Sequence, residues 1–371
     1  MTRKLFVYIL LGFNALCFCQ LLAEKPNIIV ILADDMGRDS VSAFNKGFGF
    51  QTPYIDKLAS EGMSFMEGHS GSAFCTPTRY GLLTGRYSWR SRLKKFIVPK
   101  WDAPLIEEGR VTLASMLKDQ GYDTAMIGKW HLGWNWPFVS KETVPVGDGK
   151  ALAKLAEKGI DWKAPVTGGP LSAGFDYHFG DDVINWPPFV YIENETVIGT
   201  PDPSNKYYAA YGTWVEGEVL KTITSRAVDY IEQQAKSDKP FFLYFPMTSP
   251  HSPIAPSDEF KGKSEISPYM DFIMETDDSV GQIVDAVDRS GISENTLIIF
   301  TADNGTSIKF PQKDGSIEKG IKFNVNYRGA KSDIFEGGHK VPFIVRWPSA
   351  SSDKLLTYNE SIISFSEWQK H

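Results

Sequence analysis

Two pairs of oxygen-bearing side chains stand at separate places in the chain and could together hold a metal ion. Asp34 and Asp35 are adjacent near the start, and Asp303 and Asn304 are adjacent much later. Taken alone, the first pair could cap a following helix, and Asn304 before Gly305 is typical of a turn. Taken together, three carboxylates and one amide form an all-oxygen set that suits a hard divalent cation such as Ca²⁺ or Mg²⁺. No group of histidines and cysteines has the spacing of a zinc site.

Two histidines and three basic residues complete the candidate chemistry. His131 lies two residues after Lys129, and His251 follows another apolar run. One such histidine is usually structural, but two of them, one beside a lysine, favour acid–base chemistry. Arg79, Lys129 and Lys331 would ordinarily be surface charges. Beside a carboxylate-bound metal they indicate a tetrahedral oxyanion as substrate, because cations stabilise its oxygens. The remaining histidines have no comparable placing and are expected to be structural: His69, His178, His339 and His371.

Short apolar runs end just before most of these polar residues. Their near-continuous hydrophobicity is typical of strands buried on both faces. Helical patterns lie between them, and this alternation predicts an α/β fold with a mostly parallel sheet and helices on both faces. Sites in such sheets form beyond the carboxyl ends of the strands, so the polar groups can converge there. The expected strands are residues 27–33, 124–128, 241–245, 296–302 and 341–345, and the expected helices are residues 52–62, 112–121 and 269–291.

Composition and charge exclude several classes of protein. The 371 residues are 42% hydrophobic and 23% charged, which is a globular composition rather than a disordered one. A net charge of −6 argues against a general nucleic-acid binder, and no internal apolar run is long enough to span a membrane. Residues 134–174 and 185–215 are rich in Pro, Gly and Trp and are predicted to be long loops, which are usually functional or mobile. Four aromatic residues there could stack on a sugar or aryl group, or simply pack the loops: Trp134, Trp136, Trp186 and Tyr191.

The N-terminus has the pattern of an export signal. Arg3 and Lys4 precede an apolar stretch that ends near Ala23, ahead of a polar segment. This order of positive, apolar and small residues is typical of a secretory signal. A membrane anchor is the alternative, because the stretch is long enough to lie in a bilayer. Cleavage after Ala23 would remove two of the three cysteines and leave Cys75 as a lone thiol, either buried and inert or kept for chemistry.

The segment around Cys75 carries the most specific pattern in the chain. Residues 75–86 have the sequence Cys-Thr-Pro-Thr-Arg-Tyr-Gly-Leu-Leu-Thr-Gly-Arg. It resembles the signature of the formylglycine-dependent sulfatases of the alkaline phosphatase superfamily, Cys-x-Pro-x-Arg followed by Leu-Thr-Gly-Arg. The chain is most similar to arylsulfatase-type members. Other segments between residues 25 and 348 match in the family's order: Asp34-Asp35, Gly128–Gly133, Pro250-His251, Asp303–Gly305, and Lys331 ahead of Glu336–Gly338.

The resemblance implies a covalent mechanism at position 75. A separate maturation enzyme would oxidise Cys75 to formylglycine, whose aldehyde hydrates to a geminal diol. One hydroxyl would attack the sulfur of a sulfate ester while the alcohol or phenol leaves, and the other would then lose its proton and expel sulfate. The implied cofactor is one Ca²⁺ per chain, held by Asp34, Asp35, Cys75 as formylglycine, Asp303 and Asn304.

The resemblance also implies roles for the basic residues. Arg79 would orient and stabilise the diol, and Lys129 and Lys331 would contact sulfate oxygens. His251 would act as acid for the leaving group, and His131 as base in sulfate release. Family members often have one more polar contact between the segments that carry these two histidines. The candidates for it here are Asp181, Asp182 and Asn185.

The implied fold is a mostly parallel central sheet flanked by helices, followed by a smaller C-terminal domain. We therefore expect a signal peptide over residues 1–23 and a catalytic domain over residues 24–371 that is incomplete at its C-terminus, with the smaller domain missing. The implied function is hydrolysis of aryl or carbohydrate sulfate esters. The export signal predicts a periplasmic or extracellular protein, or a lysosomal or secretory one in a eukaryote.

Two other functions remain open at the level of sequence. One is a phosphodiester or phosphonate hydrolase of the same superfamily, because phosphate and sulfate share a shape and differ in charge. The other is a truncated, inactive protein that binds sulfated glycans without hydrolysing them. The expected partners are a sulfated small molecule or glycan and the maturation enzyme. Nucleic acid is not an expected partner, nor is stable membrane insertion after signal cleavage.

Overall fold

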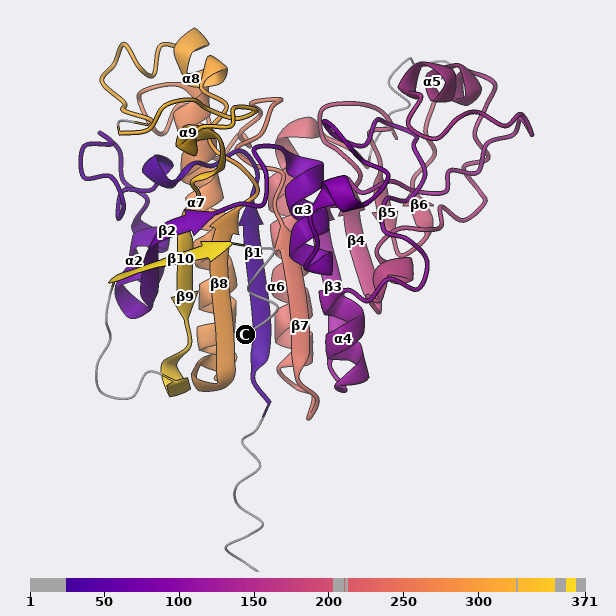
Figure 1. The fold of residues 1–371 in the computed structure, drawn as a ribbon. Coiled ribbons are helices and arrows are strands. Elements are labelled where there is room, and N and C mark those ends of the chain that lie inside the picture. Colours follow the sequence, from indigo (N-terminus) through magenta and orange to yellow (C-terminus); the bar gives the residue numbers. More distant parts are fainter. Residues whose placement is uncertain (1–24, 203–209, 211–212, 325, 351–357, 365–371) are drawn as a thin grey trace, which may run out of the picture.

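The computed structural model describes residues 25–202, 210, 213–324, 326–350 and 358–364 (Figure 1). The predicted signal peptide, residues 1–23, lies outside these described residues, as does His371. The described strands are β1 (Asn27–Ala33), β2 (Met63–His69), β3 (Asp123–Lys129), β4 (Tyr177–Asp181), β5 (Tyr191–Glu193), β6 (Thr196–Ile198), β7 (Phe241–Pro246), β8 (Thr296–Ala302), β9 (Phe343–Arg346) and β10 (Tyr358–Ser364).

Within the described residues, the strands form one ten-stranded sheet in the order β10-β2-β9-β8-β1-β7-β3-β4-β5-β6. Strand β1 lies in its centre, parallel to both β7 and β8, and β3 continues this parallel set between β7 and β4. Strand β9 is antiparallel to β8 and β2, and β5 is antiparallel to β4 and β6. The expectation of a mostly parallel sheet is confirmed, but the strand expected at residues 341–345 runs against its neighbours.

Helices cover both faces of the sheet, as the sequence predicts. Helices α6 and α7 pack together behind the sheet in Figure 1, while α3 and α4 lie in front of it. No described helix is both long and apolar enough to cross a membrane. The described α-helices are α2 (Pro53–Glu61), α3 (Cys75–Thr84), α4 (Leu113–Asp119), α5 (Gly149–Glu157), α6 (Val219–Gln234), α7 (Pro268–Arg289), α8 (Lys309–Lys313) and α9 (Glu336–His339). Short 3₁₀ helices span Arg38–Ser40, Ser88–Arg90, Leu171–Ala173, Glu216–Glu218, Ser293–Asn295 and Pro348–Ala350.

The two predicted long loops contain regular structure, which corrects part of the sequence interpretation. Helix α5 lies inside residues 134–174, where Asp148 caps it by accepting hydrogen bonds from the backbone N–H groups of Lys150 and Ala151. Strands β5 and β6 pair as a short hairpin inside residues 185–215. Both elements are short and sit at the edge of the fold, and a 3₁₀ helix over Leu171–Ala173 is a further regular element within residues 134–174.

The strands at the centre of the sheet are fully buried. All six residues of β7 are buried, and the last five residues of β1 have no exposed surface. At the end of β3 the backbone comes so close to β7 that a Cβ on Gly128 would lie 2.0 Å from the carbonyl oxygen of Pro246. Gly128 also has φ +129°, which side-chain-bearing residues rarely adopt. This glycine therefore places the next residue, Lys129, at the carboxyl end of the strand.

His178 on β4 is the fully buried histidine of this layer, and its predicted structural role fits what it contacts. Its Nδ1 lies 3.1 Å from the carbonyl oxygen of Met126 on β3. A carbonyl can only accept, so Nδ1 carries the hydrogen. Burial lowers the pKa of His178 to about 3, from its ordinary 6.5.

This burial predicts a loss of stability in acid. In the unfolded chain His178 becomes protonated as pH falls below 6.5, whereas in the folded chain it becomes protonated only near pH 3. The free energy of unfolding therefore decreases as pH falls through this interval. Each pKa unit corresponds to about 1.4 kcal/mol, so the effect is a few kcal/mol. His178→Gln, which keeps a donor, should flatten the slope of denaturation midpoint against pH between 6.5 and 4. A variant whose slope equals that of the unmodified protein would contradict this.

Candidate active site

The predicted site residues come from six separate segments that the fold brings to one end of the sheet. Asp34 and Asp35 follow β1, Asp303 and Asn304 follow β8, and the Lys129 segment ends β3. His251 lies in the loop after β7, and Lys331 lies in the loop between α8 and α9. Cys75 is the first residue of α3, and Arg79 lies one turn along it. The convergence predicted from the carboxyl ends of the strands is thus what the structure shows.

The carboxylates form a buried cluster across β1 and β8. The backbone N–H of Asp35 donates to Asp303 Oδ1 at 3.1 Å, and the Asn304 amide nitrogen donates to Asp35 Oδ1 at 2.8 Å. Asn304 Oδ1 is buried and has no hydrogen-bond partner among the described residues. Asp35 itself has φ +67°, a backbone conformation that costs energy outside glycine and is common at functional sites.

Each carboxylate of the cluster has its own cationic partner. Lys129 Nζ lies 2.5 Å from Asp34 Oδ2, and Lys331 Nζ lies 2.6 Å from Asp35 Oδ1. Arg79 Nη2 and Nε lie 2.8 and 3.1 Å from Asp303 Oδ2. The three acids and three bases therefore balance, which burial demands because an unpaired buried charge is very costly.

Arg79 also fixes the neighbouring strand. Its Nη1 donates to the backbone carbonyl of Lys129 at 2.9 Å, and Nη2 lies 3.7 Å from Asp34 Oδ1. One guanidinium thus links α3 to the ends of β1, β3 and β8. Its planar set of donors makes this possible in a way that a lysine could not.

The cations keep two of the acids ionised in spite of their burial. Burial raises the pKa of Asp34, but Lys129, His251 and Arg79 outweigh it and lower the pKa to about 2. Lys331 and His251 likewise hold the pKa of Asp35 below its ordinary value against the effect of burial. Both groups are therefore anionic at neutral pH and available to a metal ion.

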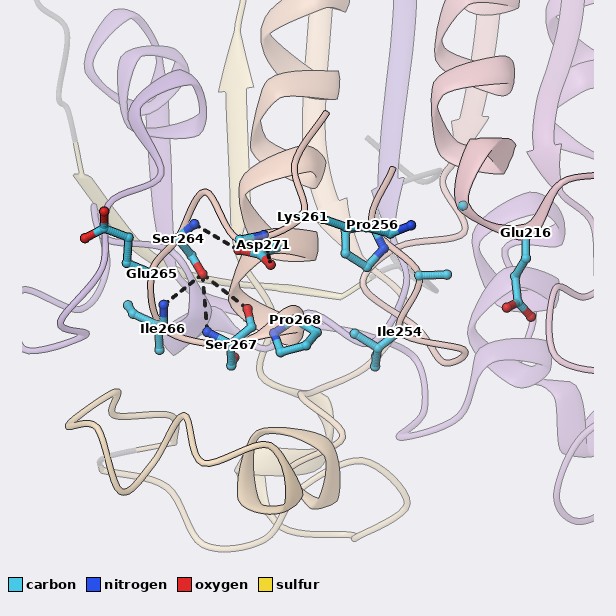
Figure 2. A pocket seen from close by; sticks show the side chains of 13 residues that line it. Glu216, Ile254, Pro256, Lys261, Ser264, Glu265, Ile266, Ser267, Pro268 and Asp271 are labelled. Carbon is cyan, nitrogen blue, oxygen red and sulfur yellow. Dashed lines mark hydrogen bonds between the residues drawn. The ribbon is translucent and has the colours of Figure 1, made fainter. Parts of the chain in front are cut away.

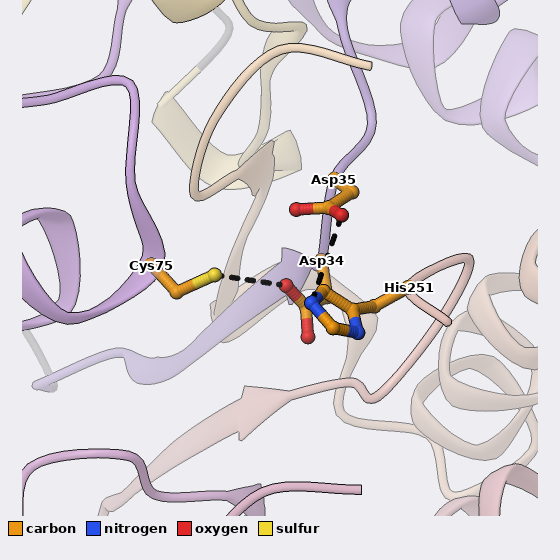
Figure 3. A group of neighbouring side chains, drawn as sticks. All are labelled: Asp34, Asp35, Cys75 and His251. Carbon is orange, nitrogen blue, oxygen red and sulfur yellow. Dashed lines mark hydrogen bonds and ion pairs between the residues drawn. The ribbon is translucent and has the colours of Figure 1, made fainter. Parts of the chain in front are cut away.

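Cys75 faces this cluster from the start of α3. Its Sγ–H donates to Asp34 Oδ1 at 3.6 Å, and Figure 3 shows the side chain pointing toward Asp34. Asp34, Asp35, Cys75 and His251 each place one possible ligand atom within 4.8 Å of the others. Burial, reinforced by the charge of Asp303, raises the pKa of the Cys75 thiol. Unmodified, it is protonated at neutral pH and is a poor nucleophile.

The two predicted acid–base histidines both line the cavity beside Cys75, and they differ in their hydrogen bonds. Both ring nitrogens of His131 are buried without a hydrogen-bond partner among the described residues, and its φ is +54°. Burial and the nearby Lys129 lower the pKa of His131 well below its ordinary value, so the ring is neutral. His251 Nδ1 lies 2.5 Å from the carbonyl oxygen of Ser252, and its Nε2 lies 3.8 Å from Asp35 Oδ2. Burial also lowers the pKa of His251.

A cavity of about 270 Å³ opens over these groups. Of the four aromatic residues that could have stacked on a substrate, only Trp186 lines this cavity. The Trp186 ring is edge-on to the His131 ring, with the ring centroids 5.3 Å apart. Trp134, Trp136 and Tyr191 are buried in packing, which is the alternative that the sequence left open. The lining residues are Asp35, Phe74, Cys75, Ile97, His131, Val183, Asn185, Trp186, His251, Ser252, Ser307, Lys309, Phe310, Lys331 and Ser332.

Among the three candidates for a further polar contact, only Asn185 lines this cavity. Asp182 Oδ1 accepts a hydrogen bond from Trp134 Nε1 at 3.2 Å, which is a structural contact. Asp181 is buried with no partner on either carboxylate oxygen among the described residues, and burial raises its pKa to about 7. Sequence analysis missed Lys309, an exposed cation in the lining, because nothing in its local pattern distinguishes it from a surface lysine.

A larger cavity of about 580 Å³ lies away from this chemistry (Figure 2). Its buried acid, Asp271, already accepts hydrogen bonds from the backbone N–H groups of Gly262 and Ser264. That carboxylate holds a loop in place, and size alone does not make this cavity a site.

Comparisons with known proteins agree with this geometry. The sulfatase family model matches residues 26–368. The chain is 33% identical to an N-acetylgalactosamine-6-O-sulfatase of Bacteroides thetaiotaomicron, over 88% of this chain and 68% of that protein. It is 30% identical to the mouse N-acetylgalactosamine-6-sulfatase, over 88% of this chain and 58% of that one. The chain thus spans between just over half and two thirds of these relatives' lengths.

A solved structure shows the same arrangement of elements. It comes from work on the metabolism of multiple glycosaminoglycans by Bacteroides thetaiotaomicron, and it superposes with a TM-score of 0.79 at 30% sequence identity. The match covers 93% of this chain and 76% of that one. Both the sequence and the fold therefore point to the same group of proteins.

The unpartnered amide oxygen of Asn304 allows cation binding to be tested by mutation. Asn304→Ala removes that oxygen and should weaken Ca²⁺ binding to chelator-treated protein, measured by calorimetric titration, by about tenfold or more, as expected when one ligand is lost. Asn295→Ala is the matched control, because the Asn295 amide bonds the backbone carbonyl of Lys25 outside the cluster. Equal affinities in the two variants would rule out Asn304 as a ligand.

Proposed function

The chain belongs to the sulfatase family, and from this premise we propose that it hydrolyses the sulfate ester of a carbohydrate. The observation that carries the proposal is the convergence of Cys75, four oxygen-bearing groups and three cations beneath one small cavity. This combination suits a singly charged tetrahedral group, because the cations can receive its oxygens and the acids can hold a metal beside it.

The donor set supports a Ca²⁺ site. Asp34, Asp35, Asp303 and Asn304 supply only oxygen ligands, and the unpartnered Asn304 Oδ1 is the kind of buried atom that a cation would satisfy. When bound, the cation would withdraw charge from a sulfate oxygen. We assign these four residues, with position 75, as its ligands.

The surroundings of Cys75 support its proposed conversion to formylglycine. A thiol held protonated by burial has little nucleophilic power, whereas a hydrated aldehyde there would supply both a hydroxyl nucleophile and a means of releasing sulfate. Cys75 also begins α3, where the helix dipole favours a negative group. Since Cys75 and Arg79 are both buried, the maturation enzyme would have to reach the segment before the chain folds.

The lysines would hold the sulfate group. Lys129 and Lys331 each have three N–H donors and spend only part of them on Asp34 and Asp35. Lys331 lines the cavity, where its remaining donors would contact sulfate oxygens. Lys129 is fully buried and does not line the cavity, and we propose that its remaining donors contact a sulfate oxygen bound beside Asp34. Arg79 donates to Asp303 and to the Lys129 carbonyl, and it would hold the ionised carboxylates and the group at position 75 in place.

The histidines would move the protons. His251 Nδ1–H donates to Ser252, so Nε2 of the neutral ring is unprotonated. We propose that Nε2 first takes up a proton, giving an imidazolium beside Asp35, and then passes this proton to the departing alcohol. His131 is neutral and has two free ring nitrogens, so it can accept the proton lost during sulfate release. Their positions on different loops keep these two roles separate.

The cavity and the relatives together favour a sugar sulfate over a simple aryl sulfate. The cavity of about 270 Å³ is slightly smaller than the roughly 300–1,000 Å³ that is usual for pockets of drug-sized ligands, so it suits a small group such as a single sulfated ring. The relatives described above are named for N-acetylgalactosamine 6-sulfate, and we propose a hexosamine 6-sulfate as the substrate class. We also propose export of the chain, from the predicted signal over residues 1–23.

A change at position 75 tests the covalent step. Protein produced with a formylglycine-generating enzyme should show an aldehyde at residue 75 by peptide mass spectrometry and should release sulfate from N-acetylhexosamine 6-sulfate. Cys75→Ala from the same host should fold with an unchanged melting temperature and have no measurable turnover. Turnover in that variant, or in protein whose residue 75 is an intact thiol, would refute the covalent scheme.

Leaving-group dependence tests the two histidines separately. His251→Gln should lose about 10²–10⁴-fold in kcat on a sugar sulfate, whose alkoxide needs a proton, and much less on nitrophenyl sulfate, whose phenolate does not. His131→Gln should slow both substrates equally, because sulfate release is common to them. If both variants respond alike to the leaving group, His251 is not the acid.

A further inference from the structure

A second cavity, of about 450 Å³, adjoins the one over Cys75. Phe74 and Ser332 line both cavities, so these two residues form the wall between them. The backbone N–H of Ser332 donates to the carbonyl of Ala73 at 3.0 Å, which ties the two halves of this wall together. The two cavities are thus neighbouring compartments along one surface.

The second cavity is lined by polar groups that carry little charge. Ser70 and Ser72 lie on one side, and His69 and His339 face each other with their Nδ1 atoms 3.0 Å apart. Burial, with His69 beside it, lowers the pKa of His339, which favours a neutral ring. Asp333 is the acidic residue in the lining, and no lysine or arginine of the described chain lines this cavity. Such a set of donors and acceptors suits hydroxyl groups better than a sulfate or carboxylate.

An exposed aromatic pair stands at the edge of this cavity. Tyr87 lines it, and the ring of Tyr87 stacks on that of Trp89, with centroids 5.9 Å apart and planes 15° apart. The two side chains are 40% and 59% exposed, although aromatic rings of this size are normally buried. A flat, exposed aromatic surface beside hydroxyl-binding groups matches a sugar ring, which has one apolar C–H face and an equatorial rim of hydroxyls.

We propose that this second cavity and the Tyr87–Trp89 pair form a subsite for the neighbouring, uncharged sugar of an oligosaccharide whose sulfated ring occupies the cavity over Cys75. The proposal rests on the proposed function and extends it from a single ring to a chain. The first cavity holds one ring, and the shared wall at Phe74 and Ser332 places the next compartment beside it. The guanidinium of Arg90 lies over the Trp89 ring, 5.8 Å from its centroid, but Arg90 does not line the cavity. Within the cavity the acidic residue is Asp333, so a uronic acid bound there would meet repulsion where a neutral hexose would not.

The test compares three substrates: an N-acetylhexosamine 6-sulfate, its disaccharide with a neutral hexose, and its disaccharide with a uronic acid. The protein with formylglycine at residue 75 should show the highest kcat/KM on the neutral disaccharide. Tyr87→Ala and Trp89→Ala should each lose up to about tenfold in kcat/KM on that disaccharide, mainly through KM, and should leave the monosaccharide unaffected. Tyr54→Ala is the matched control, because Tyr54 is 41% exposed and lies on α2, away from the cavity.

The results separate this inference from the proposed function. Equal kcat/KM for the monosaccharide and the neutral disaccharide, or equal losses on both in the Tyr87 and Trp89 variants, would overturn the subsite. If no substrate is cleaved, the proposed function is wrong. The subsite is then tested by sugar binding alone, without turnover. Calorimetric titration with the unsulfated neutral disaccharide should then still show binding that Tyr87→Ala weakens, and no such difference from Tyr54→Ala would overturn it.

Discussion

Three carboxylates can lie buried together at one end of this sheet only because three cations are buried with them or nearly so. Asp34, Asp35 and Asp303 are paired one to one with Lys129, Lys331 and Arg79 at 2.5 to 2.8 Å. Removing any single partner would leave a buried charge uncompensated, which typically costs several kcal/mol. The residues of the site therefore form a set, in which each acid requires its base and the fold requires both.

The same pairing prepares the site for chemistry. Since the cations keep Asp34 and Asp35 ionised, the cluster presents anionic oxygens in a place where burial alone would have protonated them. The backbone holds two residues of the site in conformations that are unfavourable elsewhere, with positive φ at Asp35 and His131. Rigid strand ends supply these positions, so the groups can meet a substrate without rearranging.

The cavity over the charged cluster is walled by parts of the chain other than the strand ends. The walls above the cluster come from loops and helix ends, including Phe74, Trp186 and Phe310, which share no regular element. Loops vary more easily than strands because few backbone hydrogen bonds constrain them.

Local sequence patterns were enough to predict the central strands, the acidic site residues and the family of this protein. The apolar runs of β1, β7 and β8 are visible because these strands are buried on both faces, and Asp34, Asp35, Asp303 and Asn304 follow two of those strands directly. The segment from Cys75 to Arg86 predicted the family without any coordinates. The α6 helix was overlooked although Leu220, Ile223, Ala227 and Tyr230 mark one of its faces.

Other features exist only in three dimensions. Helix α3 is buried on nearly every side and so has no amphipathic period to find. The antiparallel direction of β9, the pairing of each acid with one base, and the burial of Trp134 and Trp136 all depend on contacts between distant segments. A sequence carries the identity and local spacing of its side chains, whereas charge balance and cavity walls are properties of groups that only the folded chain brings within a few ångströms of each other.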